Sequence, residues 1–592
     1  MPGSSLFKIV ALSVSLTVTA LLPARAQDDV AASDLDILST ADVTAYQQIF
    51  DIQTNGDWRT ADRLISGLEN RVLMGHVLFQ RYMHPTAYRS EYRELAGWMA
   101  RYGDHPGAER IYRLAQRRAV RGGPALHQPV ALQPKPDLAE PTQPTEVAII
   151  TREEAREAKE HRRNVLRVQS QVGAYLRRGE PGRAEKRVWA ANQDDLLDPG
   201  TFGRTLGEIA GSYFFMGQDE KALALARLSG AASGGEHFQG DWFGGLAAWR
   251  LGDCARAAEH FERAAEASTA NSWNVAGAAF WAARAHLSCR NPERVNELLE
   301  LAAQHPKTFY GMIAARQLGH DILFTWDHPP LDRGDFEDLV ERPGVGRALA
   351  LTQIGRDDWA DMEMRYVWLR SPNEWHGPLL GLAARMNLPS TQLRGARTPH
   401  MQSVTLTDSV LYPVPSWEPT GGFSLDRALI FAFMRQESAF NANATSHAGA
   451  RGLMQLMPRT ASYISRDRTL QSAQRTRLYE PGLNMQLGQR YLDYLLNEKE
   501  YGGNLFFTAS AYNGGPGNLS RWRRQNHFRD DPLMFVESIP LRETRLYVER
   551  VISNLWIYRM RMDQPTPSLD DVARGHWPIY RPQDNQQSGQ PG

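Results

Sequence analysis

Cysteine is nearly absent from this chain of 592 residues, which contains only Cys254 and Cys289. Neither belongs to a C-x-x-C motif, and the chain has no H-E-x-x-H motif, so we expect no zinc site. We expect no cofactor either. The two thiols either form one disulfide or remain two buried thiols, because sequence spacing does not show whether their Cβ atoms meet.

An excess of charge of either sign is also missing. Lys plus Arg number 67, as do Asp plus Glu, which gives a formal net charge of zero. A protein without a net positive field has no general attraction to nucleic acid or to anionic lipid, so no nucleic-acid partner is expected. The composition, with 42% hydrophobic and 23% charged residues, is that of a globular protein. A chain of this length is too long to fold around a single hydrophobic core, so we expect two or three domains.

Long hydrophobic runs are lacking beyond the N-terminus. Lys8 precedes an apolar run over 9–22, and "ARA" at 24–26 has the A-x-A pattern of a cleavage site. This indicates a signal peptide over 1–26, removed after Ala26; a buried N-terminal helix is the alternative. The run is short for a membrane span, and no later segment is apolar enough, so we expect no transmembrane segment in the mature chain. Export would expose the cysteines to an oxidising compartment.

The region 27–330 has a strongly helical pattern, in which Ala, Leu and Arg dominate. Turns containing glycine alternate with alanines at helical spacing, as in "NGDWRTADRLISGL" (55–68), "MGQDEKALALARL" (216–228) and "LGDCARAAEHFERAAEAS" (251–268). The turn ends one helix, and small alanines let the next helix pack closely. The pattern predicts an α-superhelical array of irregular spacing, similar to tetratricopeptide repeats.

Composition changes mark the other expected boundaries. Residues 122–146 are rich in proline and lack helical periodicity, so they are predicted to be a linker or an extended surface loop. A mixed pattern over 331–412 predicts a small linking domain, and the turn-rich "PVPSWEPTGG" opens a third domain over 413–575. The polar tail 576–592 is expected to be disordered.

One glutamate stands at the end of an apolar helical stripe. Glu437 continues the spacing of five apolar residues that follow Ser424, a possible N-cap: Leu425, Leu429, Ile430, Phe433 and Met434. Burial and the negative C-terminal end of a helix both raise the pKa of a carboxyl group. A carboxyl that stays protonated near neutral pH can serve as a general acid. A surface glutamate at a frayed helix end, or one paired with an arginine such as Arg435, would fit the same pattern.

The residues after Glu437 form a loop suited to a polymer. Gly449 and Gly452 can adopt positive φ and allow close approach to the backbone, and Pro458 suits the first turn of another helix. The stretch "LMQLM" (453–457) offers thioether and amide groups that suit a sugar's acetamido arm and ring faces. Three further motifs carry amides, tyrosines and carboxylates: "NMQLGQRYL" (484–492), "AYNGGPG" (511–517) and "ESIPLRETRLYV" (537–548).

These motifs, in this order over about 421–565, closely resemble the catalytic domain of the soluble lytic transglycosylases (family 1). One departure is Gly514, where that family usually has alanine. The helical region, the smaller domain and the export signal are similar to the long, superhelical periplasmic members. The resemblance implies a mostly α protein with a lysozyme-like C-terminal domain and a periplasmic location.

The resemblance also implies a reaction. Such an enzyme, a carbon–oxygen lyase, cleaves the β-1,4 bond between N-acetylmuramic acid and N-acetylglucosamine in the glycan strands of peptidoglycan, and forms a 1,6-anhydromuramoyl product. Glu437 would protonate the leaving oxygen and then act as a base on the muramoyl 6-hydroxyl. Unlike most glycosidases, which use two carboxylates, it would act alone.

Six further residues receive supporting roles by the same resemblance. Ser446 and Gln455 would hydrogen-bond the saccharide near its acetamido group. Met457 would pack at the site. Tyr512 is expected to hydrogen-bond near Glu437, and Asn513 to hold its turn. Glu537 would bind a saccharide or peptide group. Local support of the fold is the alternative for each, and it is the role expected of Glu480, Glu543 and Arg545.

The helical array suits two uses, which are to surround a glycan strand or to dock periplasmic protein partners. Two other functions compete with the lytic reaction. A hydrolytic muramidase on the same fold would admit water, although no second carboxylate follows closely after Glu437. A scaffold without catalysis would not need the complete set of motifs.

Overall fold

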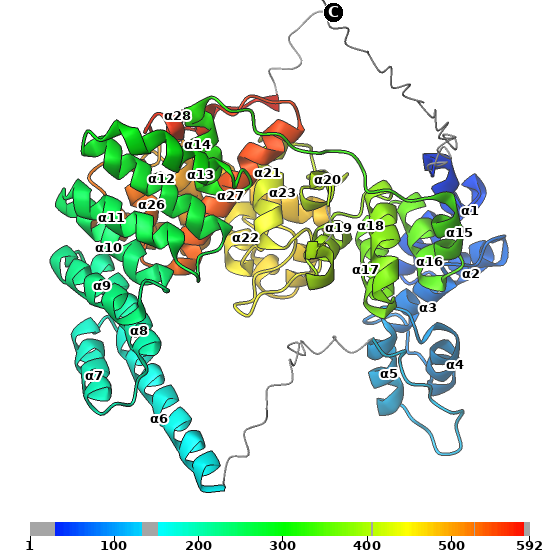
Figure 1. Ribbon diagram of the computed structural model, residues 1–592. Coiled ribbons are helices and arrows are strands. Elements are labelled where there is room, and N and C mark those ends of the chain that lie inside the picture. The colour runs from blue at the N-terminus through cyan, green and yellow to red at the C-terminus, as the bar shows by residue number, and fades with distance from the viewer. Residues whose placement is uncertain (1–29, 133–151, 404–405, 526, 585–592) are drawn as a thin grey trace, which may run out of the picture.

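The computed structural model describes residues 30–132, 152–403, 406–525 and 527–584. Throughout these ranges the regular elements are helices, joined by a few isolated β-bridges (Figure 1). The mostly α prediction is therefore confirmed. The expected signal peptide, the second half of the proline-rich stretch and residues 585–592 lie outside the described residues. Within them, no helix is both long and apolar enough to cross a membrane.

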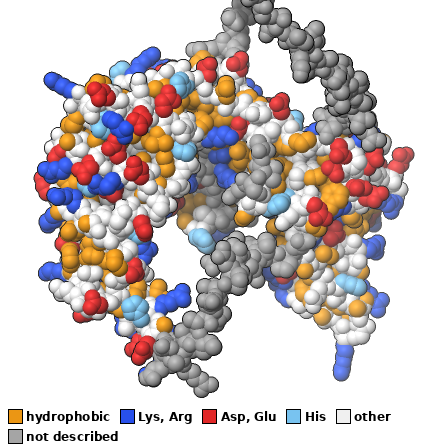
Figure 2. Space-filling view, viewed as in Figure 1, with side chains coloured by type: hydrophobic (Ala, Val, Ile, Leu, Met, Phe, Trp, Pro, Cys, Tyr) orange, Lys and Arg blue, Asp and Glu red, His pale blue; other side chains and the backbone are white. Residues whose placement is uncertain are grey.

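A curved array of stacked helices, on the left of Figure 1, occupies the middle of the chain. It comprises α6 (Arg152–Arg177), α7 (Pro181–Gln193), α8 (Pro199–Phe215), α9 (Asp219–Ser233), α10 (Phe238–Leu251), α11 (Cys254–Glu266), α12 (Ser272–Ser288), α13 (Val295–Ala303) and α14 (Phe309–Leu318). From α8 to α14, each helix packs mainly against its neighbours along the chain. Acidic and basic side chains lie interspersed over the visible face of the array, in keeping with the zero net charge (Figure 2).

The predicted turn chemistry explains how these helices stack. Gly252 ends α10 with a φ of 79°, a left-handed conformation that costs glycine little. Asp253 then caps α11, because its Oδ1 accepts the backbone N–H of Arg256 at 3.0 Å. Between α8 and α10 the backbones approach closely, since a Cβ on Gly207 would lie 2.9 Å from the backbone nitrogen of Gly240.

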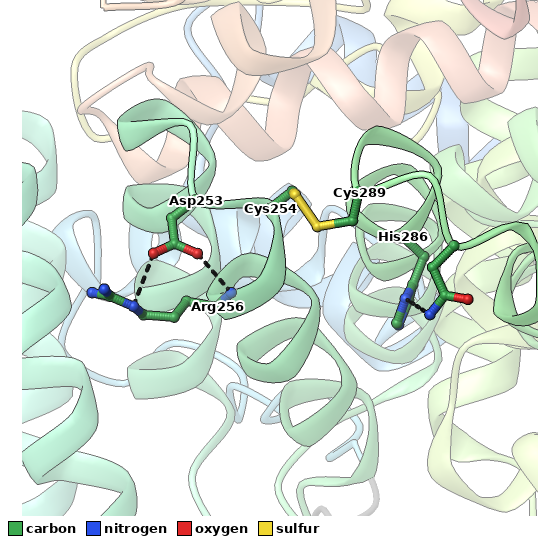
Figure 3. The surroundings of a disulfide bond; sticks show 6 residues. Asp253, Cys254, Arg256, His286 and Cys289 are labelled. Atoms are coloured by element: carbon green, nitrogen blue, oxygen red, sulfur yellow. Dashed lines mark hydrogen bonds and ion pairs between the residues drawn. A yellow bond between two sulfur atoms is a disulfide. The ribbon is translucent and has the colours of Figure 1, made fainter.

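A disulfide joins Cys254 at the start of α11 to Cys289 after α12 (Figure 3). Their Cα atoms are 5.5 Å apart, within the range that a disulfide spans. This decides between the two states that the sequence leaves open. The bond closes a stretch with a sequence separation of 35 residues within the array.

Replacing both cysteines by alanine should destabilise the array. Removing a cross-link over such a loop frees the unfolded chain, with a cost of about 2–4 kcal/mol in the free energy of unfolding. We expect a lower urea midpoint for the transition of the array, followed by circular dichroism. A reducing agent should reproduce the shift in the parent protein and leave the double variant unchanged; a parent protein that is insensitive to reduction would contradict the expectation.

The lobe on the right of Figure 1 combines two separate segments of the chain, and we call it the discontinuous lobe. Its helices are α1 (Thr40–Thr54), α2 (Trp58–Ser66), α3 (Met74–Tyr82), α4 (Tyr92–Tyr102), α5 (Ala108–Arg117), α15 (Arg333–Val340), α16 (Pro343–Gln353), α17 (Asp357–Arg370), α18 (His376–Arg385), α19 (Pro389–Ala396) and α20 (Asp408–Leu411). Buried residues of α1 and α3 share one core with α15 to α18. Gln353 Oε1 also accepts the N–H groups of Ile37 and Leu38 at 2.9 and 2.8 Å.

This core differs from the expected division into 27–330 and 331–412. The first helices pack with the second of these segments and not with the array. Periodicity shows that a helix buries one face, but it does not show which partner covers that face. The described part of the proline-rich stretch runs over this lobe, where Val130 donates its N–H to the Gly103 carbonyl at 2.9 Å.

The C-terminal domain lies between the array and the discontinuous lobe (Figure 1). It contains α21 (Arg427–Glu437), α22 (Pro458–Ser465), α23 (Pro481–Leu496), α24 (Leu505–Gly514), α25 (Pro516–Gln525), α26 (Pro532–Glu537), α27 (Arg542–Arg561) and α28 (Pro567–Ala573). Helix α21 packs on α27, and α14 of the array packs on α27 and α28. The array and this domain therefore share a continuous core.

The expectation of a disordered tail over 576–592 is wrong for residues 576–584. Trp577 packs against Phe507 and Phe535, with ring centroids 5.0 and 5.8 Å apart. Further along, the backbone N–H of Gln583 donates to Asp426 at 3.0 Å. This segment contains two aromatic residues, Trp577 and Tyr580, and both pack against the shared core.

Candidate active site

Helix α21 carries Glu437 as its last residue. The stripe that precedes it is buried as the spacing predicts, including Phe433 and Met434. The N-cap position belongs to Asp426 instead of Ser424, and its carboxylate makes no capping bond. It accepts bonds from the Arg559 guanidinium and the Gln583 backbone, which sequence proximity could not reveal. The N-terminal end of α21 is thus held by segments that come much later in the chain.

The Glu437 carboxyl group lies in an environment that favours its neutral form. Burial raises the pKa of Glu437 to about 8, the hydrogen bond from Tyr547 opposes this rise, and the charge of Glu543 adds to it. Arg435 does not neutralise the carboxyl, because it donates to the Leu411 carbonyl and to Asn554 Oδ1, each at 2.8 Å. Glu437 can therefore hold a proton at neutral pH, as a general acid requires.

The hydrogen bond to Glu437 that was expected from Tyr512 comes from Tyr547 instead. Its hydroxyl donates to Glu437 Oε1 at 2.6 Å. The Tyr512 hydroxyl donates instead to the Met454 carbonyl at 2.8 Å, and its ring packs against Phe433 at 4.9 Å. Burial raises the pKa of both phenols well above the ordinary value, so both remain neutral donors. Tyr547 lies one helical turn after Glu543, within the motif "ESIPLRETRLYV" (537–548).

The loop between α21 and α22 is held by a buried amide. Two isolated β-bridges join Arg451 to Thr445 and to Leu456. Fully buried Asn484 accepts the Met454 N–H at 2.8 Å and donates to the Arg451 carbonyl at 3.0 Å. This role of Asn484 was not anticipated. The side-chain amide of Asn484 therefore fixes the loop that follows Glu437 in the chain.

Both loop glycines have the positive φ that their positions predict. Gly449 has a φ of 90° and Gly452 a φ of 78°. A Cβ on Gly452 would lie only 2.3 Å from Nδ2 of Asn484, so only glycine fits there, whereas nothing lies within 4 Å at Gly449.

The loop carries three of the predicted binding residues. Ser446 Oγ accepts the Ala450 N–H at 3.0 Å, and Gln455 Nε2 donates to the Gly452 carbonyl at 2.8 Å. Met457 is 40% exposed and occupies the N-cap position of α22, with Pro458 as the first helical residue. The structure places these side chains on one loop that begins immediately after the acid.

The remaining predicted residues lie on α24 and α26. Asn513 Oδ1 accepts the Thr544 hydroxyl at 2.6 Å, which ties α24 to α27. A Cβ on Gly514 would lie 2.8 Å from the Trp522 ring, so the alanine usual in the resembled family would require this ring to move. Glu537 is buried and accepts the hydroxyl of Tyr310, which belongs to the array, at 2.5 Å.

The residues expected to be structural differ in exposure. Glu480 precedes α23 and has an exposed ion pair with Arg477 at 3.5 Å. Arg545 is buried and donates to the Ile539 carbonyl at 2.7 Å. The charge of Glu543 contributes least to the raised pKa of Glu437, and its expected role in support of the fold stays a prediction.

Potential cation ligands meet at one place in the described residues, inside the discontinuous lobe, where His76, His105 and Glu363 are buried together. The Arg347 guanidinium donates to both oxygens of Glu363, at 2.8 and 3.0 Å. His105 Nδ1 accepts the Gly107 N–H at 2.8 Å, which leaves the proton of the neutral ring on Nε2. A positive neighbour and a protonated ring nitrogen both oppose a cation, so these groups do not suit a cation site.

The segment that contains Glu437 and its loop is similar to a known family of domains. Residues 418–535 match the family described as "Transglycosylase SLT domain"; the match includes Glu437, the loop and α23 to α25, and it ends within α26, before Glu537. The chain is similar to the soluble lytic murein transglycosylases of Salmonella typhimurium, at 29% identity over 318 residues, and of Escherichia coli K12, at 28% over 317 residues. These alignments cover 52% and 51% of this chain, but it spans only 46% of the length of each relative.

Two solved structures share the fold over most of the chain. The 70-kDa soluble lytic transglycosylase from Escherichia coli aligns with a TM-score of 0.51 and 18% identity, over 89% of this chain and 98% of that one. An inactive glutamate-to-glutamine mutant of lytic transglycosylase Slt from Pseudomonas aeruginosa aligns with a TM-score of 0.52 and 19% identity, over 88% and 87%. The likeness therefore extends beyond the SLT domain to the helical regions before it.

Proposed function

We propose that this protein is a peptidoglycan lytic transglycosylase. It cleaves the β-1,4 bond between N-acetylmuramic acid and N-acetylglucosamine and forms 1,6-anhydromuramoyl ends. The observation that carries the proposal is the Glu437 carboxyl, which is kept protonated near neutral pH at the end of a buried helix inside an SLT domain. The names of the similar proteins and the inactivity of the glutamate-to-glutamine mutant from Pseudomonas support it.

The reaction needs only one carboxyl group from the protein. Protonated Glu437 gives its proton to the glycosidic oxygen while the bond from that oxygen to the anomeric carbon breaks. The resulting carboxylate takes the proton of the muramoyl 6-hydroxyl, whose oxygen bonds to the same carbon and closes the anhydro ring. Glu437 ends protonated and no water is consumed. An internal nucleophile has a high effective concentration, which removes the need for a second carboxylate.

The surrounding residues bind and orient the strand. Ser446 and Gln455 bind the saccharide beside its acetamido group, and the exposed thioether of Met457 packs against it. Asn513 and Tyr512 hold α24 and the loop in place through their bonds to Thr544 and Met454. In this role Tyr512 is a positioning residue, while Tyr547 sets the protonation of Glu437.

The proposed setting is the periplasm, after removal of residues 1–26. There the enzyme would contribute to turnover or remodelling of the cell wall. The array offers a concave stack of helices that would accompany the glycan strand or receive a periplasmic protein partner.

A hydrolytic muramidase is the second candidate, and Glu543 is the observation that favours it. Its charge contributes to the raised pKa of Glu437, which makes it the candidate for the second carboxylate that a hydrolytic enzyme would use. Mass spectrometry of muropeptides released from purified sacculi separates the two reactions. Products lighter than hydrolysis products by one water support the lytic reaction, whereas reducing ends that disappear with Glu543→Gln would establish hydrolysis.

Replacing Tyr547 by phenylalanine should move the pH dependence of activity. The tyrosine hydroxyl lowers the pKa of Glu437, so its loss should shift the alkaline limb of kcat/KM upward, by up to about one pH unit for one hydrogen bond. Activity at pH 7 should fall about ten-fold, because the carboxyl loses the bond that orients it. Tyr512→Phe is the matched control and should leave the limb in place. An unchanged limb in Tyr547→Phe would refute the role given to this bond.

A further inference from the structure

A pocket of about 810 Å³ lies within the C-terminal domain, at the start of α24, and we call it the arginine pocket. The described residues that line it all come from 500–530 and 577–579, so the C-terminal domain forms it alone. Asn504 caps the start of α24, whereas Tyr512 lies near the other end, next to α21. The helix between them rises about 12 Å, so this pocket is distinct from the site at Glu437.

Two buried donors in the wall of the arginine pocket lack a partner. Tyr501 is 6% exposed and Asn504 is 3% exposed. Oδ1 of Asn504 accepts the N–H groups of Phe506 and Phe507 at 2.9 and 3.2 Å, so its Nδ2 remains a donor. Neither this nitrogen nor the Tyr501 hydroxyl bonds to any described residue, and burial raises the pKa of Tyr501, so the hydroxyl keeps its proton. Such donors favour a ligand that brings an acceptor.

Three guanidinium groups make the same pocket basic, those of Arg523, Arg524 and Arg529. Arg523 stacks over the Phe507 ring at 4.6 Å, which leaves the N–H edge of its plane accessible. Its ion pair with Glu500 is long, at 3.6 Å, and solvent-exposed. Arg524 and Arg529 are exposed and form no ion pair with any described residue. Guanidinium groups of this kind bind a carboxylate through two parallel N–H groups.

Two carboxylates limit the charge of the lining. Glu500 and Asp530 against three guanidinium groups leave a net charge of +1, which suits a monovalent carboxylate better than a phosphate group with a charge of about −1.5 to −2. Asp530 Oδ1 accepts the Trp577 Nε1–H at 3.1 Å. Arg529 and Asp530 have φ values of 48° and 62°, which are strained for residues with a Cβ. The chain thus accepts strain in the turn that brings Arg529 to the pocket.

Aromatic rings form the apolar wall of the pocket: Tyr501, Phe507, Phe528 and Trp577. Trp577 packs on Phe507 and Phe528 with ring centroids 5.0 and 6.0 Å apart, so the wall is already built without a ligand. Trp577 and Ile579 are only half-buried and offer apolar surface to the pocket. A ligand that combines a carboxylate with an apolar side chain matches this lining. The last residue of a polypeptide carries both groups on one Cα atom.

We propose that the arginine pocket binds the C-terminus of a partner protein whose last residue is large and apolar. The guanidinium groups and the two buried donors bind the terminal carboxylate, and the aromatic wall receives the last side chain. Capture of a C-terminal carboxylate is a recurring mode of peptide recognition. A volume of about 810 Å³ admits a large side chain and the residues before it, whereas a terminal alanine would leave most of the pocket empty.

Short peptides test the proposal on the full-length protein. The probe is the tripeptide acetyl-Ala-Ala-Phe with a free carboxylate, titrated by calorimetry. Its C-terminal amide and acetyl-Ala-Ala-Ala are the comparison peptides. We expect the probe to bind, and both comparison peptides to bind about ten-fold more weakly or not at all. No binding of the probe, or equal binding of the probe and either comparison peptide, would overturn the proposal.

Substitutions test whether this binding occurs in the arginine pocket. Arg524→Gln and Arg529→Gln should each weaken the probe about five- to ten-fold, because each removes one charged donor. Arg521→Gln is the matched control, since Arg521 is an exposed arginine of α25 outside the lining, and it should bind the probe as the parent protein does. Equal affinity in all four proteins would overturn the assignment to this pocket.

Competition separates a carboxylate from a phosphate ligand. Inorganic phosphate should displace the probe no better than acetate does, and stronger displacement by phosphate would overturn the choice of a carboxylate. Since calorimetry needs no cleavage, the result does not depend on the reaction proposed at Glu437. Muropeptide release should be unchanged in Arg524→Gln, so a failure of either proposal is distinguishable from a failure of the other.

Discussion

Glu437→Gln should lower kcat/KM on peptidoglycan by about 10³-fold and leave the fold intact. Glutamine has nearly the same shape but cannot give or take the proton, and a positioned acid typically contributes about 10²–10⁴-fold. The release of soluble muropeptides from purified sacculi measures this loss, and circular dichroism checks the fold. Glu220→Gln is a matched control with the same chemical change on the array surface. A variant that keeps most of its activity would remove Glu437 from the reaction.

The same substitution should also change how activity and stability depend on pH. Protonated Glu437 starts the reaction, so the activity of the parent protein should decline above about pH 8. The folded pKa of Glu437 lies above the ordinary value of 4.5, so the folded state binds the proton more tightly than the unfolded state. The stability from this group is full below about pH 4.5 and is lost as pH rises through about 8. Relative to pH 5, Glu437→Gln should therefore gain stability over the parent protein at pH 9, measured by urea unfolding.

Gly452→Ala should disrupt the loop behind the acid. A side chain at a φ of 78° is strained, and the new Cβ would lie 2.2 Å from the Leu478 carbonyl oxygen. Strain and overpacking together should cost about 3 kcal/mol or more in the free energy of unfolding. Activity should fall with it, because Ser446 and Gln455 lie on this loop. Urea unfolding followed by tryptophan fluorescence measures the first effect, and muropeptide release the second.

Gly449→Ala separates the two causes of that loss. Its φ of 90° is equally left-handed, but a Cβ there would meet nothing within 4 Å. The strain alone should cost about 1–2 kcal/mol. Equal losses in both variants would show that the contacts of Gly452 with Asn484 and Leu478 do not matter.

Local patterns in the sequence identify Glu437 as the candidate acid, but they do not identify the residues that surround it. Glu437 was recognisable because the buried stripe before it lies within a few residues. Its hydrogen-bond partner Tyr547 is 110 residues away, and the partner of Glu537, Tyr310, is 227 residues away. No periodicity connects positions at such separations. The motif that contains Tyr547 indicated its importance, but the choice between Tyr512 and Tyr547 depends on the packing of α24 and α27 against α21.

The glycine turns between helices were predictable for the same local reason, whereas the start of α21 and the assembly of helices were not. The glycine turns follow from backbone conformation, and the Asp253 cap follows from a side chain that accepts an N–H group of the next helix. The shared core of α1 and α3 with α15 to α18 depends on matching apolar faces that the sequence separates by more than 250 residues. The ordered conformation of residues 576–584 likewise depends on distant residues, because Trp577 packs among the rings of Phe507, Phe528 and Phe535.

The array and the C-terminal domain share one core. A segment transferred into another protein must therefore exceed a minimum length to keep the surroundings of Glu437. The matched segment 418–535 ends before α27, so it would carry Glu437 without Tyr547 and without the helix on which α21 packs. Extending it to residue 584 would restore α27 but expose Trp556, whose ring stacks on Phe309 of α14 at 5.3 Å. A graft intended to keep the acid in its own surroundings therefore has to include the last helices of the array. The last helices of the array are thus part of the structural unit that holds Glu437.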